Sequence, residues 1–360
     1  MTHVATREER HEAENASGRR PGALARAIVL WLCVAALLVS AVFATWGALS
    51  REVYGAGAFV REYLDALSAG DAAAALALPG VSIDREKLAD AGLPAGSSDA
   101  LLRKEALGKL TDVRFVSDVA ESDGSRSITF EYVSGGKQGR STFSVSSAEA
   151  TFGLFPSWRF ERSPLSSVSL TVVHSTSFRA NGFELDTRQV APTDQAAAFT
   201  NTVSLLTFTP STIDFDLDTT MLRAPVQTAR ATDPRSVVTA SVDTTPTKAF
   251  VTEVQTQLNS YLDECATQVV LQPTGCPFGQ FLRDRVKTTP AWSMVTYPTV
   301  QIQPGETTWV MPATVGTAHL VVDVQSLFDG EVTTLDEDVP FTLSAFVTVR
   351  EDGSLYIDLR

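Results

Sequence analysis

The sequence predicts an α+β protein that begins with a membrane-spanning helix and continues with helices and antiparallel strands. Three observations support this prediction. Residues 27–49 are 23 consecutive residues without a charged side chain. Residues 53–163 and 247–360 each open with apolar residues at helical spacing and continue with alternation of period two. Residues 165–246 show several short alternating runs and no convincing helix, which is typical of a small β-sandwich.

The apolar stretch at 27–49 is long enough to cross a bilayer. As a helix it extends about 35 Å, against a hydrocarbon core of about 30 Å. A secretory signal peptide cleaved near Ala44 is the main alternative, but the apolar core of such a peptide runs to only about 15 residues. We therefore predict an uncleaved single-pass transmembrane helix at 27–49, preceded by a disordered cytoplasmic tail at residues 1–26.

Charge predicts the orientation of this helix. Arg19, Arg20 and Arg26 precede it without a nearby acidic residue, whereas Arg51 after it is offset by Glu52. The positive side stays in the cytoplasm, so we expect a cell-membrane protein whose carboxyl-terminal bulk is extracytoplasmic. The chain holds 29 basic and 42 acidic residues, a net charge of -13. This balance argues against nucleic acid as a partner, because basic patches supply most of that affinity.

Small residues form a stripe along the predicted span. Ala36, Ser40, Ala44 and Ala48 repeat at four-residue spacing, which lets two helices approach closely. The stripe allows a homodimer through the span, although an alanine-rich sequence alone also produces it.

Cys265 and Cys276 flank a polar segment of ten residues with a Pro-Thr-Gly turn. On the outer side of a membrane such a pair is expected to be oxidised. A metal site is the alternative, but no neighbouring histidine or further cysteine supplies other ligands. We predict a Cys265–Cys276 disulfide, whereas Cys33 is a single thiol within the span.

The first region, 53–163, is expected to place its helices before its sheet. Its first helix carries Phe59, Val60, Tyr63, Leu64 and Leu67 at helical spacing, and Asp71 precedes a short alanine-rich helix. We expect a further helix at 99–110, then strands, with a hairpin turn at 134–139. The middle region, 165–246, contains a second hairpin signal at Asn181-Gly182. The third region, 247–360, repeats the order of a helix followed by strands.

The order of elements in the first region resembles that of NTF2-like (cystatin-like) domains. The resemblance rests on the helix AFVREYLDALSAGD, the alanine-rich helix and a sheet that closes on WRFERSP at 158–164. The whole layout resembles membrane-anchored envelope proteins of Gram-positive and actinobacterial type in the TcaA and DUF4878-like groups, which hold such domains and small β-domains outside a single span. The resemblance implies two NTF2-like domains, at 53–163 and 247–360, flanking a small β-sandwich. It also implies a pocket between helix and sheet in some relatives.

Signals for catalysis are weak throughout the chain. Only His174 and His319 follow the predicted span, and neither has a ligand or triad partner nearby in the sequence. Ser134 and Lys137 match the SxxK pattern of penicillin-binding enzymes, but two glycines lie between them and the companion motifs are absent. We therefore assign no catalytic, cofactor-binding or metal-binding residue and expect no cofactor.

Two groups of acidic residues imitate cation sites. Asp214, Asp216 and Asp218 resemble the start of a calcium loop that lacks its later positions, so one solvent-facing side of a strand is expected. An acidic turn is expected at residues 336–338, before Pro340.

The sequence therefore favours a non-catalytic binding or scaffolding protein of the bacterial cell envelope. Its expected partners are the membrane itself and either cell-wall components or another membrane protein. The alternative is an NTF2-like pocket protein that binds or converts a small apolar ligand.

Overall fold

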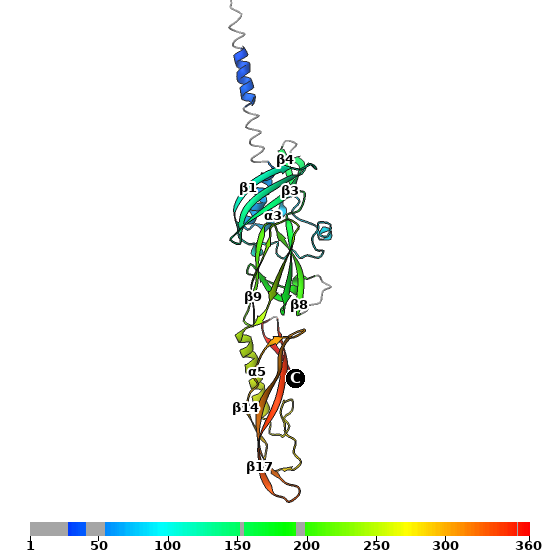
Figure 1. Ribbon diagram of the computed structural model, residues 1–360, viewed down its shortest axis with the longest axis vertical. Coiled ribbons are helices and arrows are strands. Elements are labelled where there is room, and N and C mark those ends of the chain that lie inside the picture. The colour runs from blue at the N-terminus through cyan, green and yellow to red at the C-terminus, as the bar shows by residue number, and fades with distance from the viewer. Residues whose placement is uncertain (1–27, 41–54, 152–154, 192–198, 351) are drawn as a thin grey trace, which may run out of the picture.

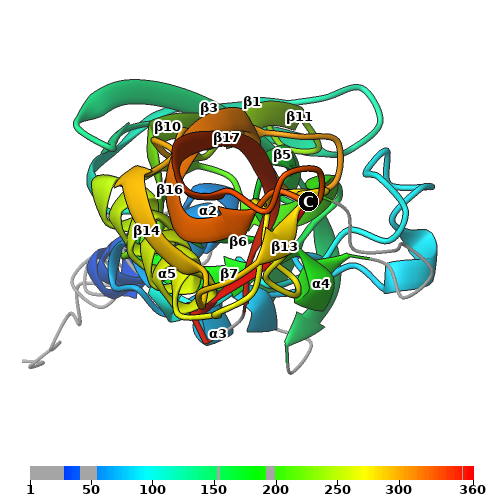
Figure 2. The same ribbon diagram turned by 90° about the horizontal axis from the view of Figure 1, so that it is seen from below.

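The computed structural model describes residues 28–40, 55–151, 155–191, 199–350 and 352–360. Beyond the amino-terminal segment, three regions follow one another along one long axis (Figure 1). A view along that axis superposes their sheets in projection (Figure 2). Strands predominate over helices, which confirms the predicted α+β class.

Residues 28–40 of the predicted span are helical with exposed side chains. The predicted tail at 1–26 and two members of the small-residue stripe, Ala44 and Ala48, lie outside the described residues. Within the described part of the chain, no helix combines the length and apolarity needed to cross a membrane. The span at 27–49 and dimerisation through it therefore stay predictions.

In the first region, a helix packs on one face of an antiparallel sheet. Strands β1 (Leu110–Ala120), β2 (Arg126–Ser134), β3 (Lys137–Thr151) and β4 (Phe155–Phe160) pair in chain order. Helix α2 (Ala56–Ser68) buries its apolar residues against them, because these recur at helical spacing along one face. The carboxylate of Asp71 caps helix α3 (Ala72–Ala77) by accepting a hydrogen bond from the backbone of Ala74 at 2.9 Å.

The predicted helix at 99–110 is wrong. This part of the chain forms turns and the short 3-10 helix η2 (Lys104–Ala106), and a similar turn, η1 (Arg85–Lys87), precedes it. The reason is that Ser98 pairs with strand β8 (Thr200–Phe208): its N–H donates to Ser204 O at 2.8 Å and its carbonyl accepts from Leu206 N at 2.7 Å. That pairing and the burial of Leu101 outweigh the local helix propensity.

The second region consists of two facing sheets. One has the order β12-β10-β9-β6-β7 and the other the order β11-β5-β8, with β11 parallel to β5. Apart from β8, whose bounds are given above, the strands of these two sheets are β5 (Leu165–Val173), β6 (Ser177–Ala180), β7 (Phe183–Asp186), β9 (Ser211–Asp218), β10 (Leu222–Ala231), β11 (Val237–Asp243) and β12 (Thr245–Pro246). Asn181 and Gly182, both at positive φ, form the predicted turn between β6 and β7. A short helix, α4 (Thr187–Val190), was not predicted.

The third region begins with helix α5 (Lys248–Ala266), which Thr247 caps by accepting a hydrogen bond from Phe250 N at 3.2 Å. Its sheet is built on two long strands, β16 (Trp309–Gln325) and β17 (Val332–Val349). Shorter strands complete the sheet: β13 (Arg285–Val286), β14 (Ala291–Thr296), β15 (Gln303–Pro304) and β18 (Leu355–Leu359). Cys265, near the end of α5, is bonded to Cys276, with their Cα atoms 5.8 Å apart.

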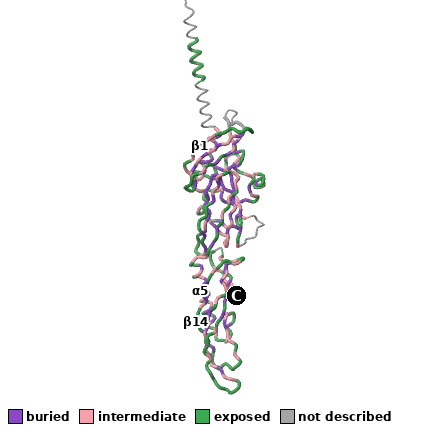
Figure 3. The backbone as a smooth tube through the Cα atoms, viewed as in Figure 1, coloured by how far each residue is buried: buried purple, intermediate pink, exposed green. Residues whose placement is uncertain are grey.

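The hydrophobic cores do not coincide with the three predicted domains. The core of the first region includes Leu165, Leu206 and Phe208, which belong to strands of the second. A single larger core joins the second and third regions and also takes in Leu101 from the first. Buried residues lie in the interior of all three regions, whereas the far end of the third region is largely exposed (Figure 3). The domain boundaries 53–163, 165–246 and 247–360 remain predictions.

Candidate functional site

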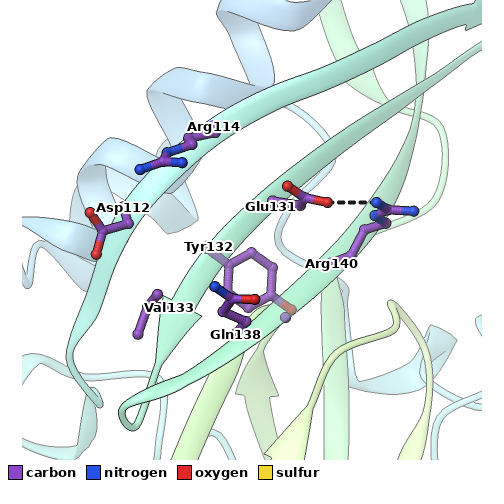
Figure 4. Close-up of a pocket in the computed structure, with 8 residues that line it drawn as sticks. Asp112, Arg114, Glu131, Tyr132, Val133, Gln138 and Arg140 are labelled. Carbon is purple, nitrogen blue, oxygen red and sulfur yellow. Dashed lines mark hydrogen bonds and ion pairs between the residues drawn. The ribbon is translucent and has the colours of Figure 1, made fainter.

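A polar groove crosses strands β1, β2 and β3 of the first sheet (Figure 4). Its volume is about 520 Å³. It forms where the sheet turns its polar face outward, because β2 alternates between buried and half-buried residues. The residues that line it are Asp112, Arg114, Glu131, Tyr132, Val133, Gln138, Gly139 and Arg140.

Charges of both signs alternate across the groove. Glu131 lies between Arg114 and Arg140 in Figure 4 and forms an ion pair of 2.5 Å with Arg140. Asp112 has a positive φ of 54° and sits in a β-bulge of β1, which turns it away from the regular ladder. Such a lining suits a polar ligand with hydroxyl or charged groups rather than an apolar one.

Tyr132 lines the groove, although its side chain is almost fully buried. Burial raises the pKa of its phenol, and the hydrogen bond with Ser141, 2.8 Å between the two oxygens, works in the opposite direction. A phenol with a raised pKa stays protonated at neutral pH. The groove therefore has the features of a binding surface, and it brings no nucleophile and base into contact.

A second candidate is the apolar end of the third region, which we call the distal tip. It comprises Val286, Leu327, Phe328 and Val332, with exposed fractions from 37% at Val286 to 99% at Phe328. Strand β13 brings Val286 close to the β16–β17 hairpin, because Arg285 and Val286 pair with Gln325 and Val324. The hairpin forms the lower end of the molecule in Figure 1.

The distal tip is far from the second region. The opposite end of β16 begins at Trp309, whose ring lies 5.7 Å from the ring of His174 and 5.5 Å from that of Phe199. The strand is 17 residues long, so the hairpin extends about 50 Å beyond that contact at roughly 3.3 Å per residue. Exposed aromatic side chains at such a projection are typical of protein interaction sites.

The two histidines that follow the predicted span are held by carboxylates. Nδ1 of His174 lies 3.2 Å from Asp243. His319 lies between two aspartates of β17, with Nδ1 2.8 Å from Asp338 and Nε2 3.2 Å from Asp336. The expected acidic turn at 336–338 is wrong, because these residues continue strand β17 and pair with β16.

The SxxK match is part of the hairpin turn. Ser134 is buried and donates a hydrogen bond to the Thr212 hydroxyl at 2.9 Å, while Lys137 begins the next strand. This contact joins the first region to the second.

The aspartates that imitate a calcium loop lie on strand β9, as expected. Asp216 forms a two-point ion pair with Arg179, at 2.9 and 2.7 Å, and Asp214 accepts a hydrogen bond from Thr228. Among the residues that the structure describes, no group of three or more His, Cys, Asp or Glu side chains has a geometry suited to a metal ion.

Sequence reasoning missed both candidate sites. The groove depends on a bulge in β1, and no local sequence pattern predicts that bulge. The distal tip had a signal, the dipeptide Leu327-Phe328 beside Asp329-Gly330, because an apolar pair in a turn sequence is unusual.

Comparison of this chain with models of protein families, with curated proteins and with solved structures found no match.

Proposed function

We propose that this chain is a membrane-anchored, extracytoplasmic, non-catalytic binding or scaffolding protein of the bacterial cell envelope. The observation that carries the proposal is the distal tip, which presents Phe328 at 99% exposure at the end of the molecule remote from the amino-terminal segment. While such a side chain is exposed to water, its free energy is about 1.5–3 kcal/mol higher than when it is buried. A partner that buries it recovers that free energy.

The disulfide supports the proposed compartment. A Cys265–Cys276 bond persists in oxidising surroundings and is rare in a reducing cytosol. It fixes the loop at 266–275, where the indole of Trp292 donates to Val270 O at 2.8 Å. The charged groove and the apolar tip together fit a protein with two attachment points, for a cell-wall component and for another membrane protein.

The alternative function, an NTF2-like pocket for a small apolar ligand, has less support. Between helix α2 and its sheet, the ring of Tyr63 lies 6.0 Å from that of Phe143 and 5.2 Å from that of Phe160. Phe59 lies 5.0 Å from Phe160 on the same side. These rings occupy the space in which that function requires a ligand.

A site-specific crosslinker tests the proposal in cells that express the full chain. We expect a photoreactive amino acid at Phe328 to crosslink to an envelope partner. The matched control is Phe346, which is 43% exposed on β17 but lies outside the tip. Equal labelling at both positions, or none at either, would contradict the proposal.

Topology is tested in the same cells. Protease added outside should digest the carboxyl-terminal bulk, and the two late cysteines should resist alkylation until reductant is added, in a Cys33→Ser background. Protection from protease while accessible controls are cut would place the bulk inside and overturn the proposed compartment.

A further inference from the structure

We propose that a pocket between the first and second regions binds a small zwitterionic amphiphile, which is a molecule with an apolar body, a positive group and a negative group. The pocket, called here the junction pocket, has a volume of about 430 Å³. Pockets of this size hold small molecules and often lie where domains meet. The proposal goes beyond the proposed function, because it requires neither the predicted span nor the distal tip.

The apolar part of the lining belongs to the core of the first region. Leu165 and Leu206, from strands β5 and β8, are 1% and 4% exposed. Three half-buried side chains from an earlier part of the chain pack against the same core and complete this lining: Leu76, Ile83 and Leu102. The pocket therefore opens the margin of a hydrophobic core to solvent, and an apolar group placed there leaves water. It is separate from the space between α2 and its sheet, which aromatic rings fill.

Charged side chains of both signs form the exposed part of the lining. Arg85 and Asp99 form an ion pair at 3.2 Å, so their charges compensate each other. Arg103 and Glu105 also line the pocket, and neither has an ion pair with any residue that the structure describes. The guanidinium carbon of Arg103 instead lies 5.2 Å from the centre of the Phe183 ring.

This charge pattern selects the ligand class. A zwitterion can place its negative group at Arg103 and its positive group at Glu105. A ligand with a single charge would satisfy one of these side chains and be repelled by the other. The apolar lining beneath them favours a ligand whose two charges are attached to an apolar body.

The wall that carries Arg103 and Glu105 is fixed at both ends by contacts with the second region. Ser98 pairs with β8 through its N–H and its carbonyl, and the side-chain amide of Asn181 donates to Ala106 O at 2.8 Å. This is the segment whose sequence predicts a helix and which forms turns instead. Because distant residues hold these turns, the two charges are positioned before a ligand arrives, and less entropy is lost on binding. Local propensity is commonly overridden in this way at functional sites.

The test is isothermal titration calorimetry on the full chain in lipid nanodiscs, with empty nanodiscs as the blank. The first probe is trileucine, whose free ends carry both charges. N-acetyl-trileucine keeps only the negative charge, trileucine amide keeps only the positive charge, and triserine keeps both charges without the apolar body. Octylphosphocholine presents the same chemistry as a single-chain lipid and is titrated separately. Binding of trileucine alone would identify a peptide as the source of the ligand, and binding of octylphosphocholine alone would identify a lipid.

Three variants locate the binding. We expect Arg103→Gln to weaken trileucine about ten-fold and to leave trileucine amide unchanged, because the amide has no carboxylate to lose its partner. Glu105→Gln should weaken trileucine to a similar extent and leave N-acetyl-trileucine unchanged. Lys104→Gln is the matched control, since Lys104 is exposed in the same 3-10 turn but does not line the pocket. If octylphosphocholine is the ligand, both pocket variants should weaken it and the control should not.

The proposal is overturned if neither trileucine nor octylphosphocholine binds. Equal affinity for all forms of trileucine would show that the end charges are not recognised, and equal affinity for triserine would show that the apolar lining is not used. A loss in Lys104→Gln as large as in the other two variants would assign the effect to the overall charge of the turn and also refute the pocket. None of these results bears on the distal tip, which crosslinking at Phe328 tests separately.

Discussion

Single polar groups join the first region to the second, and Tyr63 is the clearest of them. Its hydroxyl is buried and donates to Thr209 O at 2.9 Å. Burial raises the pKa of this phenol well above its ordinary value, and the bond to Thr209 works in the opposite direction. The neutral phenol is therefore the form that the folded state requires.

Replacing Tyr63 by Phe should lower the free energy of unfolding by about 1–2 kcal/mol at neutral pH, because the Thr209 carbonyl loses its buried donor. Urea denaturation measures the loss. Tyr356→Phe is the control, since Tyr356 is 52% exposed and a surface change of this kind stays within about 0.5 kcal/mol.

The stability difference between the natural chain and Tyr63→Phe should also depend on pH. A group whose pKa is raised by folding contributes fully below its unfolded pKa, about 10 for tyrosine, and loses that contribution as the pH rises toward the folded pKa. The advantage of the natural chain over Tyr63→Phe should be constant from pH 7 to 9 and decline above about 10. A constant advantage up to pH 11 would contradict the assignment of this burial.

Two adjacent glycines in the β2–β3 turn allow the stability cost of backbone strain to be distinguished from the cost of a steric clash. Gly135 and Gly136 both have positive φ in the β2–β3 turn, at 57° and 72°. A Cβ at Gly135 would lie 2.5 Å from the Thr212 side chain, whereas one at Gly136 would meet nothing within 4 Å. Both alanine variants should lose about 1–2 kcal/mol from strain, and Gly135→Ala should lose more. Thermal unfolding compares them, and equal losses would show that the turn moves away from Thr212.

At the level of elements, the disulfide belongs to the loop that follows helix α5. Removing it by Cys265→Ser and Cys276→Ser together should lower the free energy of unfolding by about 3 kcal/mol, because the unfolded loop gains freedom. Chemical denaturation measures this change. Cys33→Ser should leave it unaltered, and a comparable loss in that variant would mean that the thiol at position 33 has a structural partner.

Sequence periodicity predicted the elements whose side chains face one core. Residues 59–67 recur at helical spacing and form α2, and the turns at Gly135-Gly136 and Asn181-Gly182 lie where glycine and asparagine accept positive φ. It failed where a distant strand supplied the partner. Segment 99–110 has the composition of a helix, yet Ser98 pairs with β8, over 100 residues later.

The same difference between local and long-range contacts determines which parts of the candidate sites were predictable. Cys265 and Cys276 are close in sequence, so their pairing was predictable from spacing and compartment. The groove needs Asp112, Glu131 and Arg140 from three strands and a bulge, and the distal tip needs β13 to reach β16 across about 40 residues. Long-range register of this kind leaves no period in the sequence.

For the whole molecule, the shared cores determine which regions unfold together. Phe208 on β8 is fully buried in the core of the first region, while Leu101 from the first region is buried in the core of the second and third. This exchange of side chains replaces the flexible linkers that usually separate domains. We infer that neighbouring regions unfold together, because each shares a core with the next.

The contact between the second and third regions is aromatic, and it is the place where the shape of the molecule is most open to change. The ring of Trp309 lies 5.5 Å from Phe199, 5.7 Å from His174 and 6.1 Å from Phe250. Trp309 is 2% exposed. Because β16 starts at this residue, any rotation here is carried along the strand to the distal tip.

Trp309→Ala should therefore lower the free energy of unfolding by about 3–5 kcal/mol and also allow the third region to bend. Small-angle scattering of the full chain should show a shorter maximum dimension. Trp292→Ala is the matched control, because Trp292 is 7% exposed and its ring lies tilted against that of Phe278, at 5.0 Å, within the third region. It should lose stability without changing the dimension. An unchanged dimension in both variants would mean that the shared core alone keeps the two regions aligned, and that the distal tip does not depend on this contact for its position.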